Sequence, residues 1–290
     1  MQYFGLLVRR MGLSAGLAGC LIAGIWDHAA AQATNETKPL WEVGVVGGLG
    51  WIPDYPAAGQ NHLQWVGLPY LVYRGDVLRA GDKGIVRSRL FHNDRVEFDI
   101  SVSGSFPSES EYNDARAGMT DLDWLGEVGP RLQFTLARAA RHAKIDFELP
   151  VRAVFSTDFS SFGHEGYVFA PELAYQNERF GGREIDLKLS LSAKFANQDL
   201  AEYFYGVPAA FANSTRSAYT AKAGYIGSRL QLRFVETMSS RWKTFAGVST
   251  DFHQGSANDK SPLFRKSTNF SVGAGIIWSF WQSERQVNDN

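Results

Sequence analysis

Cysteine is almost absent from this chain: its 290 residues contain only Cys20, which excludes an internal disulfide framework. Long hydrophobic runs are missing beyond the first 33 residues, and the mean hydropathy is −0.21. The sequence therefore predicts no transmembrane helices. An excess of charge of one sign is also missing, because 29 basic and 30 acidic residues leave a net charge of −1. This balance argues against a nucleic-acid binder and, more weakly, against a strongly charge-selective pore.

Residues 1–33 have the composition of a secretory signal peptide. Two arginines precede an uncharged stretch of Gly, Ala, Leu and Ile, and Ala31 and Ala33 supply the small residues of a cleavage site. We expect cleavage after Ala33. A membrane anchor is the alternative, but the uncharged stretch is short and weakly hydrophobic for one. Removal of this segment leaves residues 34–290 with no cysteine and a net charge of −2.

A second interpretation concerns the same segment. Leu17-Ala-Gly-Cys20 matches a bacterial lipoprotein box, so Cys20 could carry a lipid. The residues after the cysteine, up to Trp26, are still hydrophobic, whereas lipoproteins usually become polar there. Cleavage after Ala33 is therefore favoured, and lipidation at Cys20 stays open as the alternative.

The clearest pattern in the remaining chain lies between Ile185 and Phe195. Every odd position in this stretch is apolar and every even position is polar, which is the period of a β-strand. Eleven residues at strand rise are enough to cross a bilayer core of about 30 Å when tilted, whereas strands of soluble sandwiches are about 5–6 residues long. The stretch predicts one strand of a transmembrane barrel, and a long sandwich strand is the alternative.

The same alternation recurs along the chain and supports the barrel. Clean examples are residues 95–106, 127–138 and 145–155, and aromatic residues collect towards the strand ends, as they do at the two membrane interfaces. About twelve strands can be counted, with alternating short and long connections and no convincing helix. The prediction is an all-β protein, a closed antiparallel transmembrane β-barrel over residues 34–281 with a polar tail over 282–290, in the outer membrane of a Gram-negative bacterium.

Charged residues of both signs fall on the faces that alternate with the apolar ones. In a barrel these faces line the lumen, where water and counter-charges can accommodate them. The candidate lumen-facing residues are Asp146, Glu148, Arg152, Asp186, Lys188, Lys194 and Arg233.

The last predicted strand ends in Gly275-Ile-Ile-Trp-Ser-Phe280. This form resembles the signal by which outer-membrane barrels engage the barrel assembly machinery. That signal normally ends the chain, but here Trp281 and a polar tail of nine residues follow. We expect this tail to extend into the periplasm.

Several segments together resemble the MipA/OmpV family (MltA-interacting protein). They are Leu68-Pro-Tyr-Leu-Val-Tyr-Arg74, Leu125-Gly-Glu-Val-Gly-Pro-Arg-Leu132, Leu149-Pro-Val-Arg-Ala153, Tyr203-Phe-Tyr-Gly-Val207 and Asp259-Lys-Ser-Pro-Leu263. No single segment is specific, but their order and spacing are. The resemblance implies an outer-membrane barrel surrounded by lipid. It also implies a scaffold between a murein transglycosylase and a murein synthase in cell-wall biogenesis, with no residue motif for that role.

Catalytic and metal-binding patterns are weak. Asp251, His253 and Ser256 are the only cluster with the residue types of a hydrolase triad, and a polar strand end is the simpler interpretation. The carboxylates of residues 109–123 fit a solvated loop better than a cation site. We expect no enzyme activity, no cofactor and no metal. A scaffold is the first hypothesis for function, a narrow channel for small solutes the second, and an outer-membrane enzyme the third.

Overall fold

The computed structural model describes residues 37–74, 79–80, 91–92 and 95–288. The predicted signal peptide, its cleavage after Ala33 and the alternative lipidation at Cys20 lie outside these residues. Among the described residues, no helix is both long and apolar enough to cross a membrane.

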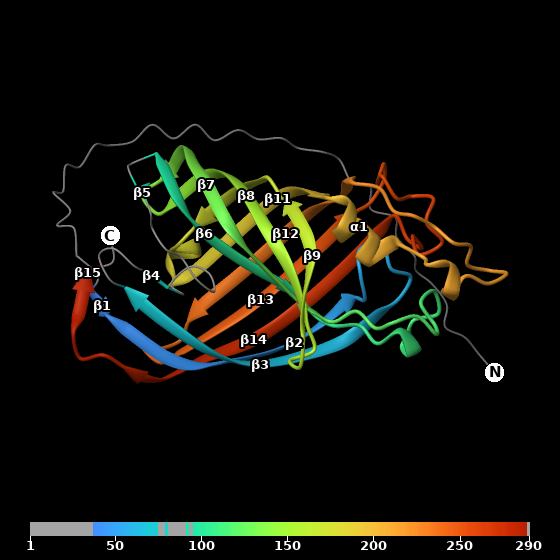
Figure 1. The fold of residues 1–290 in the computed structure, drawn as a ribbon. Coiled ribbons are helices and arrows are strands. Elements are labelled where there is room, and N and C mark those ends of the chain that lie inside the picture. Colours follow the sequence, from blue (N-terminus) through green and yellow to red (C-terminus); the bar gives the residue numbers. More distant parts are fainter. Residues whose placement is uncertain (1–36, 75–78, 81–90, 93–94, 289–290) are drawn as a thin grey trace, which may run out of the picture. The chain divides into compact units, whose positions relative to one another are not determined.

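Strands dominate the described chain (Figure 1). The long strands are β2 (Trp41–Pro53), β3 (Asn61–Arg74), β6 (Val96–Ser105), β7 (Trp124–Ala140), β8 (Ala143–Thr157), β9 (Phe162–Phe169), β10 (Glu172–Asn177), β11 (Ile185–Ala196), β12 (Gly224–Thr237), β13 (Trp242–Phe252) and β14 (Thr268–Gln282). The short strands are β1 (Thr37–Pro39), β4 (Arg79–Ala80), β5 (Phe91–His92) and β15 (Gln286–Asn288).

One antiparallel sheet joins thirteen of these strands. Its order is β4-β3-β2-β14-β13-β12-β11-β10-β8-β7-β6-β5, and β9 pairs with both β8 and β11. β9 and β10 both lie between β8 and β11 and together occupy one strand position, so the sheet has twelve strand positions. The path ends at β4 and β5, next to residues 81–90, which lie outside the described part of the chain. The predicted antiparallel barrel of about twelve strands is confirmed.

Alternation decides which side chains face outward. On β11, Leu189 and Leu191 are 42% and 52% exposed, whereas Ser190 between them is 4% exposed. The outer face also carries aromatic pairs at the membrane boundary: Trp242 stacks on Trp278 and Trp41 meets Trp281 edge to face, each pair with ring centroids 5.4 Å apart. An apolar band with aromatic edges is what lipid requires of a barrel.

The two ends of the barrel differ. The long-loop end carries residues 54–60, 106–123, 158–161, 197–223 and 253–267, and the short-turn end carries residues 141–142, 178–184 and 238–241 together with β1 and β15. In Figure 1 the helix α1 (Gln198–Tyr205) lies at the long-loop end, away from β1 and β15. The prediction that the chain has no helix is wrong at α1.

Local sequence explains this helix. The Asn197 side chain accepts a hydrogen bond from the backbone N–H of Leu200, as an N-cap does. The helix ends at Gly206, and four residues of one face are buried: Leu200, Ala201, Phe204 and Tyr205. Eight residues give little more than two turns, so the helical period is short and is easily overlooked inside a long loop.

The C-terminal tail does not simply hang free. Its residues Gln286–Asn288 pair antiparallel with Thr37–Pro39, and the backbone N–H of Leu40 donates to Arg285 O at 2.8 Å. Beneath this small sheet, the buried Arg74 contacts Glu42 Oε1 at 2.7 Å and donates to Pro39 O at 2.8 Å. The first and last described residues are therefore fastened together at the short-turn end.

Candidate functional site

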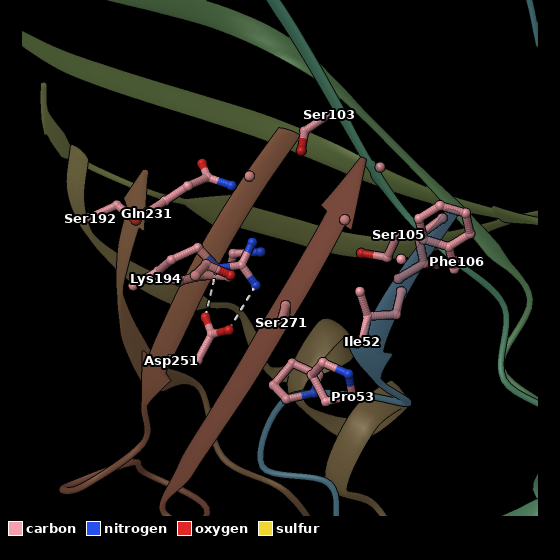
Figure 2. A pocket seen from close by; sticks show the side chains of 18 of the residues that line it. Ile52, Pro53, Ser103, Ser105, Phe106, Ser192, Lys194, Gln231, Asp251 and Ser271 are labelled. Atoms are coloured by element: carbon pink, nitrogen blue, oxygen red, sulfur yellow. Dashed lines mark hydrogen bonds and ion pairs between the residues drawn. The ribbon is translucent and has the colours of Figure 1, made fainter. Parts of the chain in front are cut away.

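The barrel encloses a lumen cavity of about 650 Å³. Figure 2 shows part of its wall, including Ser103, Ser192, Gln231, Asp251 and Ser271. The wall is asymmetric, because β7, β8, β10, β11 and β12 supply charged side chains whereas β2, β13 and β14 supply mainly glycine, alanine and serine. The predicted lumen residues belong to the charged side.

A first group of ion pairs is centred on Arg131 of β7. Its Nε donates to Oδ1 of the fully buried Asp99 at 2.9 Å, and its Nη1 donates to Glu148 Oε2 at 2.7 Å. Lys188 completes the group, with its Nζ 3.2 Å from Glu148 Oε1 and 2.6 Å from Glu172 Oε1. The structure thus places the predicted residues Glu148 and Lys188 together and joins five strands through their charges.

A second group lies nearer the long-loop end. Arg152 Nε donates to Glu127 Oε2 at 3.0 Å, and Lys194 Nζ is 3.7 Å from Glu127 Oε1. Arg229 contacts both carboxylate oxygens of Asp251 at 2.7 and 3.1 Å (Figure 2). The predicted residues Arg152 and Lys194 therefore share one carboxylate that was not among the candidates.

The remaining three predicted residues have different surroundings. Asp146 is fully buried, accepts a hydrogen bond from Thr135 Oγ1 at 2.8 Å, and lies 2.8 Å from Lys144 Nζ. Arg233 lines the cavity. Asp186 is half-buried. Among the described residues, neither Arg233 nor Asp186 makes an ion pair within 4.0 Å.

Six members of this lumen network were not among the predicted lumen-facing residues: Asp99, Glu127, Arg131, Glu172, Arg229 and Asp251. All six occupy inward positions of their strands, so the period-two pattern contained the signal. Their pairing was hidden, because partners such as Arg131 and Asp99 are 32 residues apart and only the strand register places them side by side.

Loops cover the cavity at the long-loop end. We call their shared apolar core the roof. It consists of Tyr55, Ala57, Ala58, Leu122, Leu200, Ala201, Phe204, Tyr205, Val207, Ala221 and Leu263, packed on the ends of the strands. Burial raises the pKa of the Tyr203 phenol, which packs against the roof, to about 12, and burial likewise raises the pKa values of Tyr55 and Tyr205.

The histidine of the possible catalytic cluster belongs to this roof. His253 is 4% exposed; its Nδ1 lies 2.8 Å from Ile226 O and its Nε2 accepts from the backbone N–H of Ala57 at 3.1 Å. Asp251 is paired with Arg229, and the Ser256 hydroxyl accepts from Asn258 N at 3.3 Å. Asp251, His253 and Ser256 therefore make no mutual contact of the kind that a triad needs.

The carboxylates of loop 106–123 include one that bonds to the backbone of its own loop. Asp121 accepts a hydrogen bond from the backbone N–H of Ser110 at 2.7 Å. Across the described part of the chain, no three His, Cys, Asp or Glu side chains are grouped as a metal site requires.

The family described as MltA-interacting protein MipA matches residues 44–280. This chain belongs to the MipA family. MipA-family membership and the barrel together place the protein in the outer membrane of a Gram-negative bacterium. A comparison with curated proteins gives no match.

Solved structures resemble this MipA-family barrel only distantly. The COG4313 outer membrane channel from Pseudomonas putida F1 has 13% sequence identity and a TM-score of 0.46, with 87% of this chain and 100% of that chain covered. A bacterial polysaccharide outer membrane secretin has 9% identity and a TM-score of 0.42, with 85% and 100% covered. Outer membrane phospholipase A from Escherichia coli has 10% identity and a TM-score of 0.32, with 83% and 93% covered. These likenesses are too low to indicate a function.

Proposed function

We propose that this MipA-family protein is a closed, non-catalytic barrel that docks murein-remodelling enzymes at its periplasmic face. The roof is the observation that supports this proposal most strongly. Tyr205 and Leu263 are fully buried in it, so the long-loop end has a packed core of its own. A barrel that is blocked in this way is suited to holding a partner rather than to conducting solutes.

Charge pairing in the lumen supports the same proposal. Buried carboxylates such as Asp99 and Glu148 each form an ion pair with Arg131. Ion pairs of this kind join neighbouring strands across the lumen and leave their charges compensated. Channel selectivity, in contrast, usually relies on rings of unpaired charge that face the permeant ion.

The short-turn end has the features of a docking surface. The β7–β8 hairpin carries Arg138 near the end of β7 and Arg141 in its turn, both exposed. The turn also accepts a hydrogen bond at His142 O from Glu178 N, in the next turn, at 2.9 Å. Loop 106–123 at the other end has five acidic residues and one arginine. We place the short-turn end in the periplasm with both termini, where its basic turns suit an acidic surface on an enzyme.

A pull-down tests the docking proposal. The full chain is purified in detergent, immobilised, and exposed to a periplasmic extract of a Gram-negative bacterium. We expect a murein transglycosylase or synthase to be retained, and the double variant Arg138→Gln/Arg141→Gln to retain several-fold less. The matched control, Lys222→Gln/Lys260→Gln at the long-loop end, should retain the wild-type amount. Absence of any murein enzyme from the wild-type eluate would contradict the proposal.

A further inference from the structure

The inward side chains form rows that run across the strands. Cross-strand partners share one face of a sheet, so the register of β11, β12, β13, β14 and β2 defines each row. One of these, here called the cation row, consists of Lys188, Arg233, Gly247, Gly273 and Gly50. All five residues line the lumen cavity.

The three glycines line the cavity beside Arg233 and add no side chain to it. A Cβ atom on Gly247 or Gly273 would meet only backbone atoms as its nearest neighbours, at 3.2 Å or more. Gly275 in the next row towards the short-turn end differs, because a Cβ there would overlap the ring of Phe245. The Phe245 ring therefore fills the row next to the cation row on the short-turn side, whereas no side chain fills the glycine half of the cation row.

Arg233 faces this space, and no acidic side chain of the described residues lies within ion-pair distance (4.0 Å) of it. Lys188, its neighbour in the row, is held by Glu148 and Glu172 on the other side. Asp186 is the carboxylate of the next row, beside Val235, and it makes no ion pair with Arg233 within 4.0 Å. A guanidinium in such a position matches a carboxylate, which it can bind through two parallel hydrogen bonds.

Polar side chains line the cavity on the long-loop side of the cation row, and an apolar surface lies on its short-turn side. The next row towards the long-loop end consists of Ser190, Gln231, Ser249 and Ser271, and three of these four line the cavity. On the short-turn side, the Phe245 ring also lines it. Hydroxyl and amide groups are suited to a ligand with several hydroxyls, and an aromatic ring is suited to the C–H face of a ring.

We propose that the lumen cavity binds a small hydroxylated carboxylate of the sugar-acid class. Its carboxylate lies on Arg233, its hydroxyls meet the serine row, and its C–H face lies over Phe245. A volume of about 650 Å³ falls in the range of small-molecule sites. This site is independent of the docking surface, so either proposal can fail alone.

Calorimetric titration of the full chain, folded in detergent, tests the site with sodium glucuronate as the probe. Glucose supplies the same ring without the charge, and sodium acetate supplies the charge without the hydroxyls. We expect glucuronate to bind at least about tenfold more tightly than either, because glucose lacks the charge-assisted hydrogen bonds to Arg233 and acetate lacks the hydroxyl contacts with the serine row. Binding of glucuronate no tighter than acetate would reveal general anion attraction and overturn the proposal, as would no binding at all.

Variants locate the binding group. Arg233→Gln should weaken glucuronate binding about tenfold or more, whereas Arg241→Gln, in an exposed turn, should leave it unchanged. Heat-modifiable migration on a gel confirms that each variant folds. If Arg233→Gln does not fold, Arg233→Lys serves instead. Lysine keeps the positive charge but cannot form the bidentate hydrogen bonds of a guanidinium, so this variant should still bind glucuronate more weakly than the wild type. Wild-type affinity in a folded Arg233 variant would overturn the assignment.

Discussion

His253 accepts a hydrogen bond from the backbone N–H of Ala57, although the two residues are 196 positions apart. The same ring contacts Ile226 O through its other nitrogen, and a Cβ on Gly227 would come within 2.6 Å of it. The His253 side chain therefore connects loop 54–60 and loop 253–267 to the first residues of β12. Its role in the roof explains a polar cluster that could otherwise suggest catalysis.

His253→Leu tests this fastening. The substitution leaves the N–H of Ala57 and the carbonyl of Ile226 buried without their partner, which should destabilise the roof by about 1–3 kcal/mol. Limited proteolysis should then cut residues 197–223 or 253–267 faster than in the wild type. His142→Leu, in an exposed turn, is the control and should keep the wild-type rate. Equal rates for His253→Leu and the wild type would show that the roof does not depend on this ring.

Lipid contact on β11 can be tested by adding one charge on either side of the sheet. Leu189→Arg puts a cation on the exposed outer face, which should lower the free energy of unfolding by about 2–4 kcal/mol near the membrane midplane. Gln231→Arg adds the same charge on the lumen face of the adjacent strand, where water can solvate it, and should cost less than about 1 kcal/mol. Urea unfolding in lipid vesicles measures both. A larger loss for Gln231→Arg would reverse the assigned facing.

Among the lumen charges of the described residues, Arg131 should be the one whose substitution lowers the free energy of unfolding most. Arg131→Met removes a cation shared by two buried carboxylates, Asp99 and Glu148, and leaves Glu148 with Lys188 alone; removing one partner from a buried ion pair costs about 3–5 kcal/mol. Arg141→Met, on the exposed turn of the same hairpin, should change stability by less than about 0.5 kcal/mol. The two variants are compared by urea unfolding in vesicles. Similar stability for both would mean that the lumen charges are solvated rather than paired.

The roof should loosen at alkaline pH. The pKa of Tyr203 is raised to about 12, above the value of about 10 in an unfolded chain. Folding therefore favours the protonated phenol, and its stabilising contribution is complete below pH 10 and is lost as the pH rises from about 10 to 12. Tyrosinate absorbance during a base titration should show a late-ionising phase. Tyr203→Phe should reduce that phase, and Tyr112→Phe, at an exposed site, should not.

Alternation along the chain was enough to predict the barrel, because lipid outside and water inside select opposite residue types at successive positions of a strand. Leu189 and Ser190 are an example of that contrast. The helix α1 could not be predicted in this way, since its eight residues lie in a long loop and their buried face contacts the roof. The fastened tail was also missed, because its pairing with Thr37–Pro39 joins the two ends of the chain.

The candidate site was predictable in part. The inward facing of Glu148, Arg152, Lys188 and Lys194 follows from period two alone. Which charges meet depends on register, and register is set by pairing between strands that are distant in sequence. The open space beside Arg233 depends on three separate strands placing glycine in one row, so no local stretch of sequence reveals it.

Single-channel recording in planar bilayers tests the central claim most directly, because a roofed barrel with paired lumen charges should not conduct. We expect the purified full chain to give no stable current steps, and a variant lacking residues 198–223, which removes α1 from the roof, to give them. Stable steps from the wild-type protein would contradict the closed scaffold and establish a channel instead.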